Sequence, residues 1–148
     1  MVRYTLLLMA LSVATMGAQT TDWIGTMEVH DSRGLSIGRI TATLTTTPTT
    51  LSGEWRSKSG ASGSMTGTIN DKGRIKATFT AFGGARFDDG RAVPERCHGS
   101  AQAAGQLHTS GVVRLTIDRI RLDTPQQRAR ERACEDLTDV VVLLQPAH

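Results

Sequence analysis

The stretch MTGTINDKGRIKATFTA, residues 65–81, decides the fold class of this chain. Small or apolar residues alternate with polar ones on both sides of the tetrapeptide Asn70-Asp71-Lys72-Gly73. The alternating small or apolar residues are Met65, Gly67, Ile69, Ile75, Ala77, Phe79 and Ala81. A period of two residues is typical of a strand buried on one face, and a short polar segment ending in glycine is typical of a tight turn. The stretch therefore predicts a β-hairpin.

The same alternation recurs along the chain and predicts eight strands. Their approximate ranges are 23–29, 40–45, 51–56, 65–69, 74–81, 97–103, 113–122 and 140–144. In the seventh, Ile120 and Leu122 lie on the opposite parity to Val113, which predicts a β-bulge near Asp118-Arg119. The last strand is apolar on both parities and is expected to be covered on both faces.

One short helix is expected between the last two strands. Thr124 is suited to the N-cap, Pro125 to the first helical position, and the helix is expected to end near Ala133.

Strands joined mainly by hairpins, without crossover helices, predict an antiparallel sheet that hides its edges by closing. We therefore expect an all-β, up-and-down, eight-stranded barrel, with the short helix before the last strand. An interior of this size holds its own side chains or one small ligand. The large residues on the inward parity are Trp23, Met27, Trp55, Met65 and Phe79. Several inward positions are glycine or alanine, and these either let the strands bend or leave space.

The N-terminus has the layout of a secretory signal peptide. Arg3 precedes an apolar run over residues 6–13, and small residues follow to Ala18. We expect residues 1–18 to be removed and residues 19–148 to form a single domain in the periplasm or outside the cell. In an oxidising compartment, Cys97 and Cys134 are expected to form a disulfide.

Charge and aromatic content exclude two classes of partner. The net charge is +3, and the basic residues are scattered rather than interleaved with aromatics, so no nucleic-acid binding is expected. The low aromatic content and the glycines and alanines on the apolar parity do not fit a membrane-inserted barrel with aromatic girdles.

Two segments resemble the calycin superfamily, which contains the lipocalins and the avidin-like proteins. Residues 51–55, LSGEW, resemble its Gly-x-Trp strand, and residues 65–73, MTGTINDKG, its Thr-Gly-Thr strand with the following turn. The spaced motifs and the late cysteine pair are also similar to a group of uncharacterised secreted bacterial proteins. The resemblance implies a barrel with an interior ligand. The Gly-x-Trp element stands on the third strand rather than the first, and two tryptophans are too few for an avidin-like biotin site.

No motif for catalysis, a cofactor or a metal emerges. His30-Asp31-Ser32 has the residue types of a hydrolytic triad, but three neighbours cannot converge on one reacting atom. Asp88-Asp89-Gly90 lacks the spaced ligands of a calcium loop and is interpreted as part of a flexible surface loop. Cys97, His98 and Cys134 would supply at most three zinc ligands, and Glu54 is expected to face water.

We therefore expect an exported, non-catalytic barrel without a cofactor that binds a small apolar or amphipathic ligand. Its expected lining is Trp23, Met27, Trp55, Met65 and Phe79. The alternative is a packed barrel that acts through its loops, as an inhibitor or envelope partner. The segment from Gly83 to Glu95, the longest predicted loop, would then meet a protein partner.

Overall fold

A computed structural model describes residues 17–95, 97–123 and 134–147 of the chain. Every regular element in these residues is a β-strand. The eight strands are β1 (Gln19–Asp31), β2 (Gly34–Thr46), β3 (Thr50–Ser57), β4 (Ser62–Ile69), β5 (Arg74–Phe82), β6 (His98–Leu107), β7 (Val113–Asp123) and β8 (Leu137–Pro146). The predicted helix and most of the predicted leader fall outside the described residues.

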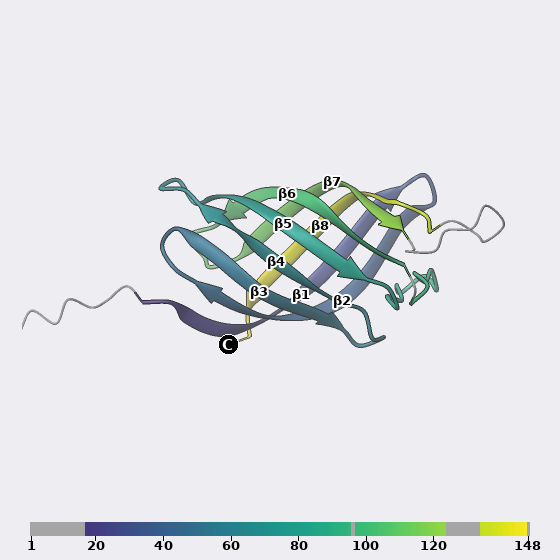
Figure 1. The fold of residues 1–148 in the computed structure, drawn as a ribbon, viewed down its shortest axis with the longest axis horizontal. Coiled ribbons are helices and arrows are strands. Elements are labelled where there is room, and N and C mark those ends of the chain that lie inside the picture. The colour runs from purple at the N-terminus through teal and green to yellow at the C-terminus, as the bar shows by residue number, and fades with distance from the viewer. Residues whose placement is uncertain (1–16, 96, 124–133, 148) are drawn as a thin grey trace, which may run out of the picture.

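The strands form a closed antiparallel barrel in simple chain order (Figure 1). Each strand pairs with the next one in sequence, and β8 returns to β1 from Trp23↔Pro146 to Val29↔Val140. Closure leaves neither β1 nor β8 as a free edge. The predicted eight-stranded up-and-down barrel is confirmed.

The hairpin that decided the fold class has a local explanation. The side-chain oxygen of Asn70 accepts hydrogen bonds from the backbone amides of Lys72 and Arg74, both at 2.9 Å. This arrangement fixes the turn, as asparagine often does. Gly73 has a φ of +76°, and a Cβ there would lie 2.7 Å from the carbonyl oxygen of Leu107. Glycine is thus required for both conformation and space.

The predicted bulge lies in β7. Ser100 pairs with Arg121 and Ala104 with Thr116, so β7 has one residue more than β6 between these two pairs. The register between β7 and β8 does not change there, because β8 also shifts its side-chain alternation, between Leu137 and Val140. Asp139, at this shift, has a φ of +50°, a left-handed conformation that aspartate tolerates better than most residues.

The inward side chains form a single apolar core, and the inward glycines explain how the strands approach one another. A Cβ at Gly25 would lie 1.7 Å from the carbonyl oxygen of Leu143 on β8, and one at Gly67 would lie 2.3 Å from that of Lys76 on β5. These glycines therefore bring neighbouring backbones together. At these two positions the small inward residues leave no empty space, because the neighbouring backbone occupies it.

The strand limits differ from the prediction mainly in length. β1 begins at Gln19, β6 continues to Leu107, and β8 spans Leu137–Pro146. Backbone pairing with a neighbouring strand extends past the last apolar residue, so alternation alone places the ends too early. In the last strand, which was expected to be covered on both faces, the inward side chains are buried and the outward side chains of Val141 and Leu143 are partly buried.

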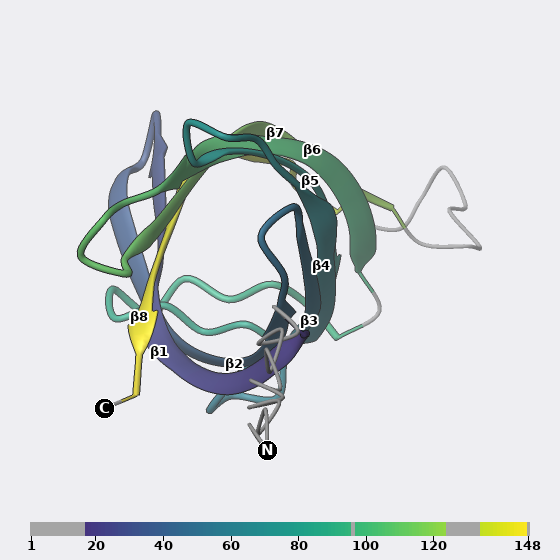
Figure 2. The same ribbon diagram turned by 90° about the vertical axis from the view of Figure 1, so that its left-hand side faces the viewer.

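The two ends of the barrel are built differently. At one end, which we call the strap end, residues 83–95 form a segment between β5 and β6 that we call the strap. At the other end, which we call the turn end, three turns join the strands at residues 47–49, 70–73 and 108–112. Figure 2 looks along the barrel from the turn end, and the strap crosses behind the ring of strands.

Candidate functional site

The five residues predicted to line a ligand site come from four strands and share one core. Trp23 and Met27 lie on β1, Trp55 on β3, Met65 on β4 and Phe79 on β5. All five are buried and belong to the interior cluster. Their inward direction follows from the alternation, while their role in binding a ligand stays a prediction.

Trp55 is a structural anchor of the barrel wall. Its indole nitrogen donates a hydrogen bond to the carbonyl oxygen of Thr80, at 2.9 Å, and its ring stacks on Phe79 with centroids 5.3 Å apart. A Cβ at Gly63 would lie 2.4 Å from this nitrogen, so the indole occupies space that glycine leaves free. The hydroxyl of Thr80 accepts a hydrogen bond from the amide of Ser64 at 2.8 Å.

The middle of the barrel is filled by its own side chains. Met65, Phe79, Leu115 and Val142 each expose 0% of their surface. Such complete burial is normal for a closely packed protein interior. A ligand therefore cannot reach them without moving neighbouring side chains.

Trp23 has the opposite hydrogen-bonding status from Trp55. Its side chain is only 6% exposed, yet its indole nitrogen is buried without an acceptor, and it is the only such side-chain atom among the described residues. Its cross-strand partners are Ala42 on β2 and Pro146, the last residue of β8. Trp23 therefore lies level with the final residue of β8, toward the turn end of the barrel.

The strap closes the opposite end with apolar side chains. Phe87 and Val93 are buried in the core cluster, and the ring of Phe87 lies 3.3 Å from where a Cβ of Gly38 would stand. The strap folds back on itself through hydrogen bonds between Gly84 and Val93 and between Val93 and Ala85. The interpretation of Asp88, Asp89 and Gly90 as part of a surface loop agrees with their exposure, while the apolar residues Phe87 and Val93 on either side are held in the barrel end.

Polar contacts attach the strap to the hairpin between β1 and β2. The guanidinium of Arg91 donates a hydrogen bond to the carboxylate of Asp31, and these two side chains are 9% and 11% exposed. The hydroxyl of Ser36, which is buried, donates to the carboxylate of Asp89 at 2.7 Å. The amide of Asp88 also donates to the carbonyl of Ile37, at 2.8 Å.

These contacts shift the titration of both aspartates. The hydrogen bond from Arg91 is the main cause that holds the pKa of Asp31 below its ordinary value, assisted by the amide of Arg33. For Asp89, the hydrogen bond from Ser36 is the main cause of a lowered pKa, followed by the amide of Arg91. Each contact favours the charged carboxylate, so the strap is attached most firmly when both aspartates are ionised.

The predicted disulfide joins the end of the strap region to the segment before β8. Cys97 and Cys134 are bonded, with Cα atoms 5.8 Å apart, and both are buried. Next to this bond, Arg33 donates to Glu135 at 2.6 Å. The strap end is thus held by a covalent bond as well as by packing and ion pairs.

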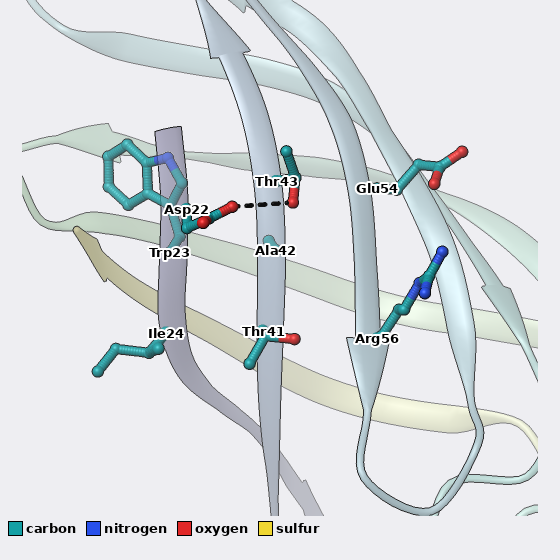
Figure 3. A pocket seen from close by; sticks show the side chains of 8 residues that line it. All are labelled: Asp22, Trp23, Ile24, Thr41, Ala42, Thr43, Glu54 and Arg56. Carbon is teal, nitrogen blue, oxygen red and sulfur yellow. Dashed lines mark hydrogen bonds between the residues drawn. The ribbon is translucent and has the colours of Figure 1, made fainter. Parts of the chain in front are cut away.

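A polar groove of about 470 Å³ lies on the outside of β1, β2 and β3 (Figure 3). Asp22 accepts a hydrogen bond from Thr43 at 3.2 Å, and the side chains of Glu54 and Arg56 stand across from them. Ile24 adds an exposed apolar side chain, 42% exposed. As expected, Glu54 faces water.

Neither metal binding nor a helical membrane span is indicated within the described ranges. No three His, Cys, Asp or Glu side chains among them are grouped so as to hold a metal ion. In the same residues, no helix has the length and apolar character needed to cross a membrane.

Comparison with models of known families, with curated proteins and with solved structures finds no match to this chain.

Sequence reasoning missed two features, one at each end of the barrel. Phe87 and Val93 are apolar residues within a charged, glycine-rich segment, and this was the available signal that the strap packs inward. The unpaired indole nitrogen of Trp23 left no such signal, because the sequence does not say which buried donors find an acceptor.

Proposed function

We propose that this protein is an exported, non-catalytic binding protein that takes a small apolar or amphipathic ligand into the turn end of its barrel. The ligand class is the one expected from the sequence, and the binding site is restricted to the turn end of the barrel. Trp23 would contact the ligand, while Met65 and Phe79 would form a packed floor beneath it.

The difference between the two ends of the barrel carries the proposal. At the strap end, Phe87 and Val93 and the cysteines of the disulfide are buried. At the turn end, none of the residues in the turns 47–49, 70–73 and 108–112 is buried. Apolar side chains also fill the turn end, where Leu51, Ile75 and Val113 are each 1% exposed, but no strap covers them there. The proposal is therefore that the ligand enters at the turn end and displaces some of these side chains.

Two further observations support this reading. A disulfide fits the oxidising compartment in which an exported protein works. The resemblance to the calycin superfamily on residues 51–55 and 65–73 agrees with a closed eight-stranded barrel, and interior ligands are what that resemblance implies.

The alternative is a packed barrel that acts on a protein partner through the strap, and it has its own support. Arg86, Asp88 and Gly90 are exposed on a segment whose apolar residues are anchored in the barrel. An exposed loop anchored on a folded scaffold is a common way to present a binding surface.

A matched pair of substitutions tests the place of the ligand. Ala42 is the neighbour of Trp23 on β2, and Ala81 lies on β5 next to the strap end; both are buried. The disulfide-bonded mature chain would be purified from its export compartment, examined by native mass spectrometry for a bound molecule, and titrated with small ketones and hydrocarbons.

We expect Ala42→Leu to abolish binding by filling the space beside Trp23, and Ala81→Leu to preserve it. Far-UV circular dichroism would verify the fold, and Ala42→Val provides a milder change if the leucine variant does not fold. Absence of both a copurified molecule and any titratable binding would refute the proposal. Loss of binding only in Ala81→Leu would place the ligand at the strap end and contradict the proposal.

A further inference from the structure

The buried, unpaired indole nitrogen of Trp23 is the starting point. A buried donor without an acceptor is uncommon in native proteins and carries a free-energy cost. The chain has two tryptophans, and the other one, Trp55, has its acceptor at 2.9 Å. The indole nitrogen of Trp23 therefore lacks the hydrogen-bond acceptor that the barrel supplies to the indole nitrogen of Trp55.

The surroundings of Trp23 indicate what kind of acceptor fits. Its cross-strand partners, Ala42 and Pro146, offer no polar side chain, and proline has no backbone N–H. The nearest acid in sequence, Asp22, is on the outer face with its carboxylate directed to Thr43 (Figure 3). Because neither cross-strand partner is a cation, an anion placed beside the indole would be desolvated without a charged partner from them, and a neutral acceptor is favoured.

An ordered water would need further partners at this place. A buried water normally makes two to four hydrogen bonds to polar groups, and the indole nitrogen of Trp23 is the only unpaired buried side-chain polar atom in the described part of the chain. A water beside it would have to take its other hydrogen bonds from backbone groups or from side-chain atoms that already have a partner.

We propose that Trp23 is the specificity-determining donor of the barrel, and that its ligand is an apolar molecule with one neutral oxygen acceptor, such as a ketone, ester or lactone. This inference rests on the proposed function and adds the chemical class of the ligand. The apolar body of the ligand contacts the inward side chains of the turn end, and its oxygen accepts the hydrogen bond from the indole. Because the nitrogen is shielded in the unliganded barrel, side chains at the turn end must shift when the ligand binds.

Nuclear magnetic resonance of the two indole N–H groups tests this directly. The full mature chain, labelled with ¹⁵N, would be titrated with 1-tetralone and with tetralin, which share a bicyclic skeleton and differ in the carbonyl. A linear pair, 2-decanone and 1-decene, would repeat the comparison. We expect the Trp23 resonance to move downfield when either ketone is added but not when either hydrocarbon is added, and the Trp55 resonance to stay in place.

The variant Trp23→Phe keeps an aromatic ring and removes the donor. We expect its affinity for the ketones to fall about five-fold, the effect of one neutral hydrogen bond, and its affinity for the hydrocarbons to stay within about two-fold. Decanoate is expected to bind more weakly than 2-decanone at neutral pH.

The outcomes separate this inference from the proposed function. If ketones and hydrocarbons bind equally well and Trp23→Phe weakens both alike, the inference is overturned while the barrel remains a binding protein. Stronger binding of decanoate than of 2-decanone also overturns it, because the site would then prefer an anion. If none of these probes binds and no molecule copurifies, the proposed function is overturned, and the inference with it.

Discussion

Replacing each tryptophan with phenylalanine is one chemical change in two different hydrogen-bonding environments. In Trp55→Phe the carbonyl oxygen of Thr80 loses the donor that now lies at 2.9 Å. In Trp23→Phe no hydrogen bond is lost, because the indole nitrogen has no acceptor in the described structure. The two variants are therefore expected to differ in stability although both residues are buried.

The expected magnitudes follow from these contacts. For Trp55→Phe, the lost hydrogen bond contributes about 1 kcal/mol, and the vacated volume beside Gly63 about 1 kcal/mol more. The free energy of unfolding should fall by about 2 kcal/mol. For Trp23→Phe, a similar volume loss is offset by removal of an unsatisfied donor, whose burial costs about 1–3 kcal/mol. The free energy of unfolding should therefore stay about the same or rise by up to about 2 kcal/mol.

Urea denaturation followed by far-UV circular dichroism measures both variants without relying on tryptophan fluorescence. The disulfide must be intact in every sample, so that the unfolded states are comparable. A loss of 2 kcal/mol corresponds to a fall in melting temperature of about 6–10 °C for a domain of this size. Equal destabilisation by the two substitutions, or a larger loss in Trp23→Phe, would contradict the conclusion that the indole N–H of Trp55 is hydrogen-bonded and that of Trp23 is not.

Three further predictions concern the strap end. Phe87→Ala removes a buried ring from the barrel end. Hydrogen exchange of the strap amides should therefore accelerate at least ten-fold, while exchange of the β4 and β5 amides changes little. Uniform acceleration would show that the strap does not open separately from the barrel. The pKa of Asp31 and that of Asp89 are held below the ordinary value of 3.8. Protection of the strap amides against hydrogen exchange should therefore be complete above that pH and decline as the pH falls through the lower folded-state pKa values. Hydrogen exchange measured at several acidic pH values checks this. If protection instead declines between pH 5 and 7, these carboxylates are not responsible. Replacing both Cys97 and Cys134 with serine should lower the free energy of unfolding by about 3–4 kcal/mol, as measured by urea denaturation, and an unchanged value would mean that the bond adds nothing to the packing around it.

Much of the wall of the barrel follows from local sequence. The alternation in residues 65–81 and the turn at Asn70 predict a hairpin that the structure contains with the same inward parity. The bulge in β7 was also predictable, since one extra residue moves Ile120 onto the face of Ile117. In each case the information lies within a few neighbouring residues, because the two faces of a strand alternate by geometry alone.

The parts that sequence reasoning missed depend on contacts between distant segments. Residues 31 and 91 form an ion pair, and residues 36 and 89 a hydrogen bond, across separations that no local pattern encodes. The same holds for the glycines. Their number suggested either bending or empty space, and only the approach of the neighbouring backbone to Gly25 and Gly67 ruled out empty space at these two positions.

By itself, then, the sequence determined an all-β chain, its turns, its inward parity and the pairing of its two cysteines. Tertiary structure alone decided that the strap closes one end of the barrel, that Trp55 has an acceptor and that Trp23 has none. The physical reason is that burial of a side chain follows from local periodicity, whereas satisfaction of a buried donor requires a particular atom from another strand within about 3 Å.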